Sequence, residues 1–177
     1  MNTHETSLNI WTQGQERDPS YLPFFSSRAC KQVVRLMDTN TLMRTLDGTL
    51  TCTTLYGHKY RSAITGQDRM PMALEGLTRG KSLWIDSLVH FTCPLTPQQE
   101  TQHLSRTPVP GSVCLHTPEE TVTLHERGAD VSFSEHDVPE DSFLSYRPRL
   151  LMAVTNITIT ANEWQHTEEW QLDLEEI

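Results

Sequence analysis

Alternation of apolar and polar residues is clearest near the C-terminus of the chain. Trp170, Leu172 and Leu174 alternate with acidic and amide side chains. This two-residue period is typical of a strand that buries one face and exposes the other. A second run rich in β-formers covers residues 149–160, and a short polar stretch separates the two runs. The pattern therefore predicts a C-terminal β-hairpin over residues 149–177.

A second hairpin is predicted in the first third of the chain. Asp47-Gly48 lies between two alternating runs, residues 41–46 and 49–55. Asp-Gly between such runs is a strong hairpin signal, and it favours a type I′ turn because both residues tolerate positive φ.

Three more segments carry strand signals. Residues 59–65 alternate, and so do residues 81–92, although the apolar phase of the latter slips near Ser87. Such a slip indicates a bulge or a sharp bend. Residues 28–37 fit a helical stripe as well as a strand, and the lack of a capping box or a run of helix formers favours the strand.

Two segments lack a clear period. Residues 1–25 contain scattered apolar positions broken by prolines, which predicts an extended arm that docks through a few anchors. Residues 93–120 contain five prolines and predict a long Pro-rich loop or an arm that contacts a neighbouring subunit. Together the patterns predict a single all-β domain over residues 1–177, an antiparallel β-sandwich or barrel.

Charge and composition narrow the function classes. The net charge is -9 and the 14 basic residues are dispersed, which argues against nucleic acid as a bound ligand. No apolar run is long enough to span a membrane, and the first residues lack the features of a signal peptide. The 4 cysteines are widely separated, so we expect free thiols in a reducing cytoplasm, with a zinc site as the alternative.

The motifs of common enzymes are missing from the sequence. It contains no G-x-S-x-G, P-loop or G-x-G-x-x-G pattern, and no H-E-x-x-H spacing. His90 and Cys93 are the nearest approach to a pair of metal ligands, with no second pair at a suitable spacing. We therefore expect no catalytic residues, no metal and no cofactor.

The four tryptophans divide into two groups. Trp84 and Trp170 fall within strands and are expected in the core. Trp11 in the arm and Trp164 in the turn of the terminal hairpin suit an interface anchor or a platform for a sugar ring.

Ordered fragments of the chain form a recognisable series from one end to the other: residues 24–29, 43–50, 58–68, 71–92, 146–150 and 170–176. In content and order this series resembles small structural proteins of bacteriophage tails. The resemblance implies a non-enzymatic virion protein, assembled in the host cytoplasm, that forms a homo-oligomeric ring with other tail proteins around the DNA channel. Tail tube, distal tail, hub and adaptor positions all remain open.

Specific residues follow as candidates for these roles. The acidic side chains of the last strand are expected to face either solvent or the channel, where they would let DNA pass without specific binding; they are Glu169, Asp173 and Glu175. The expected subunit contacts are Trp11, Trp164, Pro108 and Pro110. The alternative function is a carbohydrate-binding β-sandwich that uses Trp11 or Trp164 as its stacking platform.

Overall fold

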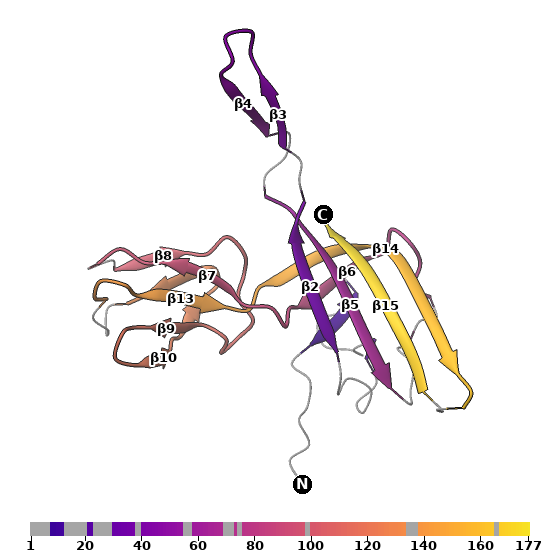
Figure 1. The fold of residues 1–177 in the computed structure, drawn as a ribbon. Helices are drawn as coiled ribbons and strands as arrows, with labels where there is room; N and C mark the ends of the chain where they lie inside the picture. Colours follow the sequence, from indigo (N-terminus) through magenta and orange to yellow (C-terminus); the bar gives the residue numbers. More distant parts are fainter. Residues whose placement is uncertain are drawn as a thin grey trace.

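A computed structural model describes residues 8–12, 21–22, 30–37, 40–54, 58–68, 73, 76–97, 100–133, 138–164 and 167–177. Every regular element in these residues is a β-strand, and all strand pairs are antiparallel (Figure 1). The predicted all-β class is confirmed. None of the described residues forms a helix long and apolar enough to cross a membrane.

The largest sheet, which we call the main sheet, has six strands. In spatial order they are β1 (Asn9–Thr12), β6 (Ser82–Asp86), β14 (Arg149–Asn162), β15 (Thr167–Glu176), β5 (Tyr60–Asp68) and β2 (Lys31–Leu36). One face of the sheet covers a core that includes Ile64, Met152 and Leu172, each 0% exposed. The predicted C-terminal hairpin is present as β14 and β15, and the strand favoured within residues 28–37 is β2.

A second group of strands lies between β6 and β14 in the chain, and we call residues 88–147 the inserted unit. One sheet contains β10 (Thr121–Thr123), β9 (Cys114–His116), β13 (Phe143–Tyr146) and β7 (Phe91–Pro94). The other contains β11 (Glu126–Arg127), β12 (Asp130–Ser132) and β8 (Thr101–His103). Val131, Phe133 and Leu144 belong to a second buried cluster here. Buried side chains thus gather in two cores, and the one-domain description stays a prediction.

The segment of residues 93–120, which was predicted to form a Pro-rich loop, contains β-strands. It contributes the end of β7 together with β8 and β9, and Leu104 and Val113 from it are buried in the second core. The prediction of a long loop without strands is therefore wrong. Its strands have three or four residues and are too short to show a clear alternation.

The phase slip near Ser87 marks the place where the chain leaves the main sheet for the inserted unit. β6 ends at Asp86, and the chain returns at Arg147 and Pro148, just before β14. The outgoing and returning segments are hydrogen-bonded to each other. Ser87 N donates to Pro148 O at 3.1 Å, and Arg147 Nε donates to Ser87 O at 2.6 Å. The predicted bend is therefore the junction between the two cores.

The hairpin predicted at Asp47-Gly48 forms a two-stranded sheet of its own, β3 (Asn40–Arg44) and β4 (Leu50–Thr54). Its turn differs from the type I′ expectation. Gly48 has φ 83°, whereas Asp47 keeps a negative φ, and Gly48 N donates to Thr45 O at 2.9 Å. This arrangement is a type I turn followed by a glycine bulge, because only one position needs the left-handed conformation. Figure 1 shows this projecting hairpin extending away from both cores.

The predicted N-terminal arm lies partly outside the described residues. Its described part supplies β1, an edge strand that pairs with β6. Leu8, Ile10 and Leu22 are buried in the core of the main sheet. These three side chains are the anchors through which the described part of the arm docks.

Candidate functional site

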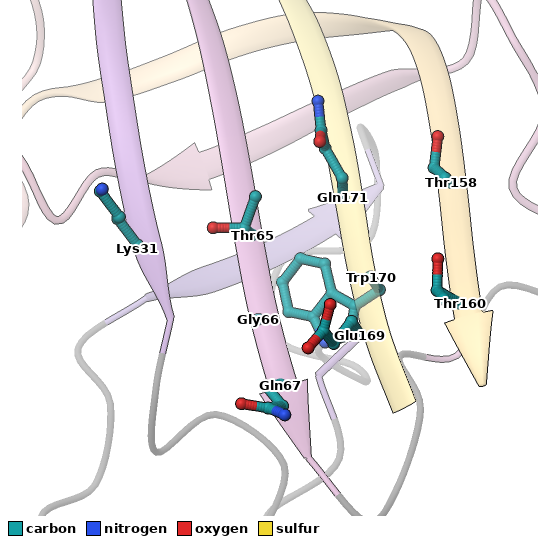
Figure 2. Close-up of a pocket in the computed structure, with 9 residues that line it drawn as sticks. All are labelled: Lys31, Thr65, Gly66, Gln67, Thr158, Thr160, Glu169, Trp170 and Gln171. Carbon is teal, nitrogen blue, oxygen red and sulfur yellow. The ribbon is translucent and has the colours of Figure 1, made fainter. Parts of the chain in front are cut away.

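The outward side chains of β2, β5, β15 and β14 form one broad polar surface, which we call the charged face. Cross-strand partners share a face of a sheet, so the register gives its composition row by row. One row contains Lys31, Thr65, Gln171 and Thr158, which lie across four strands in Figure 2. The row toward the end of β15 contains Arg35, Arg61 and Glu175.

The predicted acidic face belongs to β15 alone. Glu169, Asp173 and Glu175 do project together, but β2 and β5 place Lys31 and two arginines beside them. Arg61 Nη2 lies 2.5 Å from Glu175 Oε1. The surface is therefore mixed in charge rather than uniformly acidic. Alternation along β15 indicates which of its residues share a face, but it does not reveal which strand becomes the neighbour.

Hydrogen bonds occupy part of this surface. Gln171 Nε2 donates to Asp173 Oδ1 at 2.8 Å, and Asn156 Nδ2 donates to Asp173 Oδ2 at 3.4 Å. Arg35 is exposed and lies directly opposite Arg61 in the pairing of β2 with β5. Like charges in directly opposed positions repel each other. This end of the charged face consequently carries more positive charge than its neighbouring carboxylates neutralise.

Two hollows lie on the charged face. The one at the arginine end has a volume of about 580 Å³, and we call it the arginine groove; its lining includes Arg35, Arg61, Arg79, Val33, Asp173 and Glu175. The other has a volume of about 370 Å³, and its lining includes Lys31, Gln67, Thr160 and Glu169 (Figure 2). Sequence reasoning missed the contributions of Arg35 and Arg79, because they come from separate segments that only the fold brings together.

The tryptophans occupy different environments from one another. Trp170 is 2% exposed in the core, as predicted, and its Nε1 has no acceptor among the described residues. Trp84 is only half-buried, so its assignment to the core is wrong: it lies on the outer face, opposite Trp11. The guanidinium of Arg149 stacks over the Trp11 ring at 5.0 Å from its centroid. Trp11 is therefore a half-buried stacking partner within the subunit, not a free anchor.

Trp164 and the two prolines complete the predicted contact residues. Trp164 is 95% exposed in the turn between β14 and β15, so it remains a candidate anchor. Pro110 is exposed as well, but Pro108 is buried and forms a β-bridge with Pro148 at the junction. Pro108 cannot serve as an exposed contact, because it is buried.

The projecting hairpin exposes apolar side chains that the sequence did not single out. Met43 and Leu50 are more than half exposed, and Leu46 at the tip is fully exposed. Among the named strands, β3 and β4 contact only each other. Its turn is itself well formed: hydrogen bonds from the Thr45 hydroxyl and the Thr49 amide hold the pKa of Asp47 below its usual value. An isolated two-stranded hairpin is only marginally stable in water.

Groups suited to catalysis are few in the described part of the chain. No set of three or more His, Cys, Asp or Glu residues is placed there to hold a metal ion. His116 Nε2 lies 2.7 Å from Ser145 Oγ, and its Nδ1 lies 3.0 Å from Thr121 Oγ1. A nucleophile and a base are thus in contact, but a threonine stands where a carboxylate orients the base in a Ser-His-Asp triad.

Cys30, Cys93 and Cys114 form no disulfide bond, and the side chain of Cys52 lies outside the described part. Burial raises the pKa of the Cys93 thiol. The thiol form is therefore favoured at Cys93, and this is the less reactive form.

No protein-family model matches the chain, and no curated protein matches it either. The role of the charged face and of the projecting hairpin is consequently argued from their geometry.

Proposed function

We propose that this chain is a non-enzymatic structural subunit of a phage tail, and that it forms a homo-oligomeric ring around the DNA channel. Other tail proteins would contact the ring on either side. The observation that carries this proposal is the projecting hairpin, which stands apart from both cores and exposes Met43, Leu46 and Leu50.

The energetics of the hairpin favour association. Burying one large apolar side chain stabilises a contact by about 1.5–3 kcal/mol. In the isolated subunit, three exposed apolar side chains of the hairpin lack that stabilisation. A second copy is the simplest partner, since most soluble oligomers are closed and homomeric. The order of sequence fragments typical of tail proteins supports the same class of assembly.

The charge distribution supports passage of DNA without binding. The chain carries a net charge of -9, and its 14 basic residues are dispersed. A negative wall repels phosphate groups and lets a duplex slide. The proposed location is the virion tail after assembly in the host cytoplasm, where free thiols persist.

A direct test compares the wild type with the triple variant Met43→Ser, Leu46→Ser and Leu50→Ser. Light scattering after size exclusion and negative-stain electron microscopy report the assembly state. We expect rings for the wild type and a folded monomer for the variant, with unchanged circular dichroism. Thr49→Ser with Thr51→Ser is the matched control, because it alters exposed polar positions of the same hairpin.

The location in the particle is tested separately. Mass spectrometry of purified virions, with immunogold labelling of their tails, should detect the chain there. A wild-type protein that stays monomeric at high concentration and is missing from virions would rule the proposal out.

A carbohydrate-binding role is the second candidate, and one observation favours it. Trp164 is 95% exposed in the turn between β14 and β15, and Trp84 is half-buried on the outer face of β6. Aromatic rings in such positions suit stacking against sugars. Glycan-array binding that is lost in Trp84→Ala or Trp164→Ala, with no change of assembly state, would favour this role over the ring.

A further inference from the structure

We propose that copies of this chain associate head to tail, with the far end of the inserted unit of one subunit seated in the arginine groove of the next. This inference deepens the ring proposal and rests on it, since it names the surfaces that join neighbouring subunits. The molecule that occupies the groove is therefore a second copy of the chain.

The arginine groove lacks anionic partners for two of its three guanidinium groups. Glu175 is engaged by Arg61, and Asp173 accepts hydrogen bonds from two amides. Arg35 and Arg79 are exposed and form no ion pair with any described residue. Val33 is 37% exposed and adds an apolar patch to the lining. The groove therefore suits a projection that carries carboxylates around a small apolar centre.

The far end of the inserted unit has that composition, and we call it the acidic tip. β9 ends where β13 begins, because His116 pairs with Phe143, so the turns at residues 117–120 and 139–142 lie at the same end. β7 and β8 also have their far ends here, since Pro94 pairs with Phe143 and β8 starts at Thr101. Five exposed carboxylates occupy this end: Glu100, Glu119, Glu120, Glu140 and Asp141. Its described residues, in 94–97, 100, 115–121 and 138–143, include no lysine or arginine.

The acidic tip also has an apolar centre. A hollow of about 250 Å³ lies between the two turns, and Leu115, Pro118, Val122 and Pro139 are among its lining residues. Glu119 and Glu120 line the same hollow. Pro118 is exposed and rigid, so it can meet Val33 of the groove at a low entropic cost.

The two surfaces are different and lie on different parts of the subunit. In Figure 1 the strands of the inserted unit extend away from β2, β5 and β15, whose outward side chains form the charged face. A contact between unlike patches is heterologous, and repeating it generates a ring when the rotation closes. Opposite charge on the two patches also disfavours groove-to-groove and tip-to-tip pairing, which gives the contact its direction.

Reciprocal charge reversal tests this pairing. One variant carries Arg35→Glu and Arg79→Glu in the groove, and the other carries Glu119→Lys and Glu120→Lys at the tip. Each variant alone places like charges opposite one another at the substituted positions, so we expect self-association to weaken on the order of 100-fold. Mixed in equal amounts, the variants restore opposite charges at both types of contact. Analytical ultracentrifugation should then show assemblies of wild-type size in the mixture only.

Arg127→Glu provides the control, because Arg127 is exposed on β11, outside both surfaces. It should assemble like the wild type, and circular dichroism should show that all variants are folded. The inference is overturned if either reversal leaves association unchanged, if the mixture does not recover, or if the wild type never associates. Assemblies that persist in both reversal variants but are lost in the hairpin variant would reject this pairing and leave the ring proposal standing. A monomeric wild type that is missing from virions would reject both.

Discussion

Gly66 on β5 lies directly opposite Trp170 on β15, and the buried indole occupies the space that a side chain at position 66 would need. A Cβ added at Gly66 would lie 2.5 Å from Cε2 and 2.8 Å from Nε1 of the indole. These separations are far shorter than van der Waals contact. The glycine is therefore required by packing, since its backbone does not adopt a positive φ.

Gly66→Ala is expected to lower the free energy of unfolding by about 1–3 kcal/mol, the usual cost of overpacking a core. Urea denaturation followed by tryptophan fluorescence measures the change. Thr65→Ala is the control, because its side chain projects outward on the charged face, and it should stay within about 0.5 kcal/mol of the wild type. In a Trp170→Leu background the alanine should cost less, so fully additive costs would contradict the assigned contact.

A partly buried ion pair joins the start of β14 to the end of β6. Asp86 is 4% exposed and accepts hydrogen bonds from Arg149 Nε at 2.8 Å and Nη2 at 3.4 Å. Arg149→Met leaves a buried carboxylate without its ion-pair partner, which should cost about 3–5 kcal/mol. The double variant with Asp86→Leu should be more stable than Arg149→Met alone, and chemical denaturation compares the two. Equal stability of Arg149→Met and the wild type would contradict the pairing.

Arg106 links the inserted unit to the main sheet. Its guanidinium donates to Glu176 Oε2 at 3.0 Å and to His58 O at 2.7 Å, and the hydrogen bond with Glu176 raises its pKa. Arg106→Met should lower the free energy of unfolding by about 1.5–3 kcal/mol, the range for hydrogen bonds to charged groups. Hydrogen exchange should show faster opening of residues 87–90 and 147–148, whereas Arg127→Met should leave both measurements unchanged. If Arg106→Met loses stability without faster exchange at these junction residues, the contact does not act by holding the junction closed.

Alternation along several segments predicted the fold class, and alternation along β15 predicted part of the core. Trp170, Leu172 and Leu174 are buried as their period indicates, because their strand has ten residues and shows several full periods. The strands of the inserted unit have two to four residues, so their alternation is too short to recognise. Several of them pair with distant segments, as β8 does with β12. The local sequence pattern does not indicate which distant strand will be the partner.

The composition of the candidate site was less predictable for the same reason. Arg61 and Glu175 are 114 positions apart, and only the pairing of β5 with β15 brings them together. The acidic side of β15 could be predicted from the sequence, but the arginines that lie beside it in the fold could not. The Asp47-Gly48 signal located the projecting hairpin correctly, yet its isolation from both cores depends on the tertiary structure around it.

Stability is expected to fall in mild acid through His90. Burial, followed by the charges of Arg147 and His116, lowers the pKa of His90 below the ordinary value of 6.5. The unfolded chain therefore binds more protons than the folded chain between these two pKa values, and the free energy of unfolding decreases as pH falls through that window. Denaturation midpoints at pH 7.5 and pH values below 6.5 report the loss. His90→Gln should show a smaller decrease, and an unchanged pH dependence would exclude a role for this histidine.

Trp164 should matter for association and not for folding. Its side chain is 95% exposed, so truncation removes almost no buried surface from the subunit. Trp164→Ala should keep the free energy of unfolding within about 0.5 kcal/mol of the wild type. Trp84→Ala is the informative comparison, because Trp84 is half-buried opposite Trp11 and its removal should cost stability. If Trp164 anchors a neighbouring subunit, ultracentrifugation will show weaker assembly of a fully stable Trp164→Ala protein. A loss of stability in that variant would instead mean that the indole packs on its own hairpin.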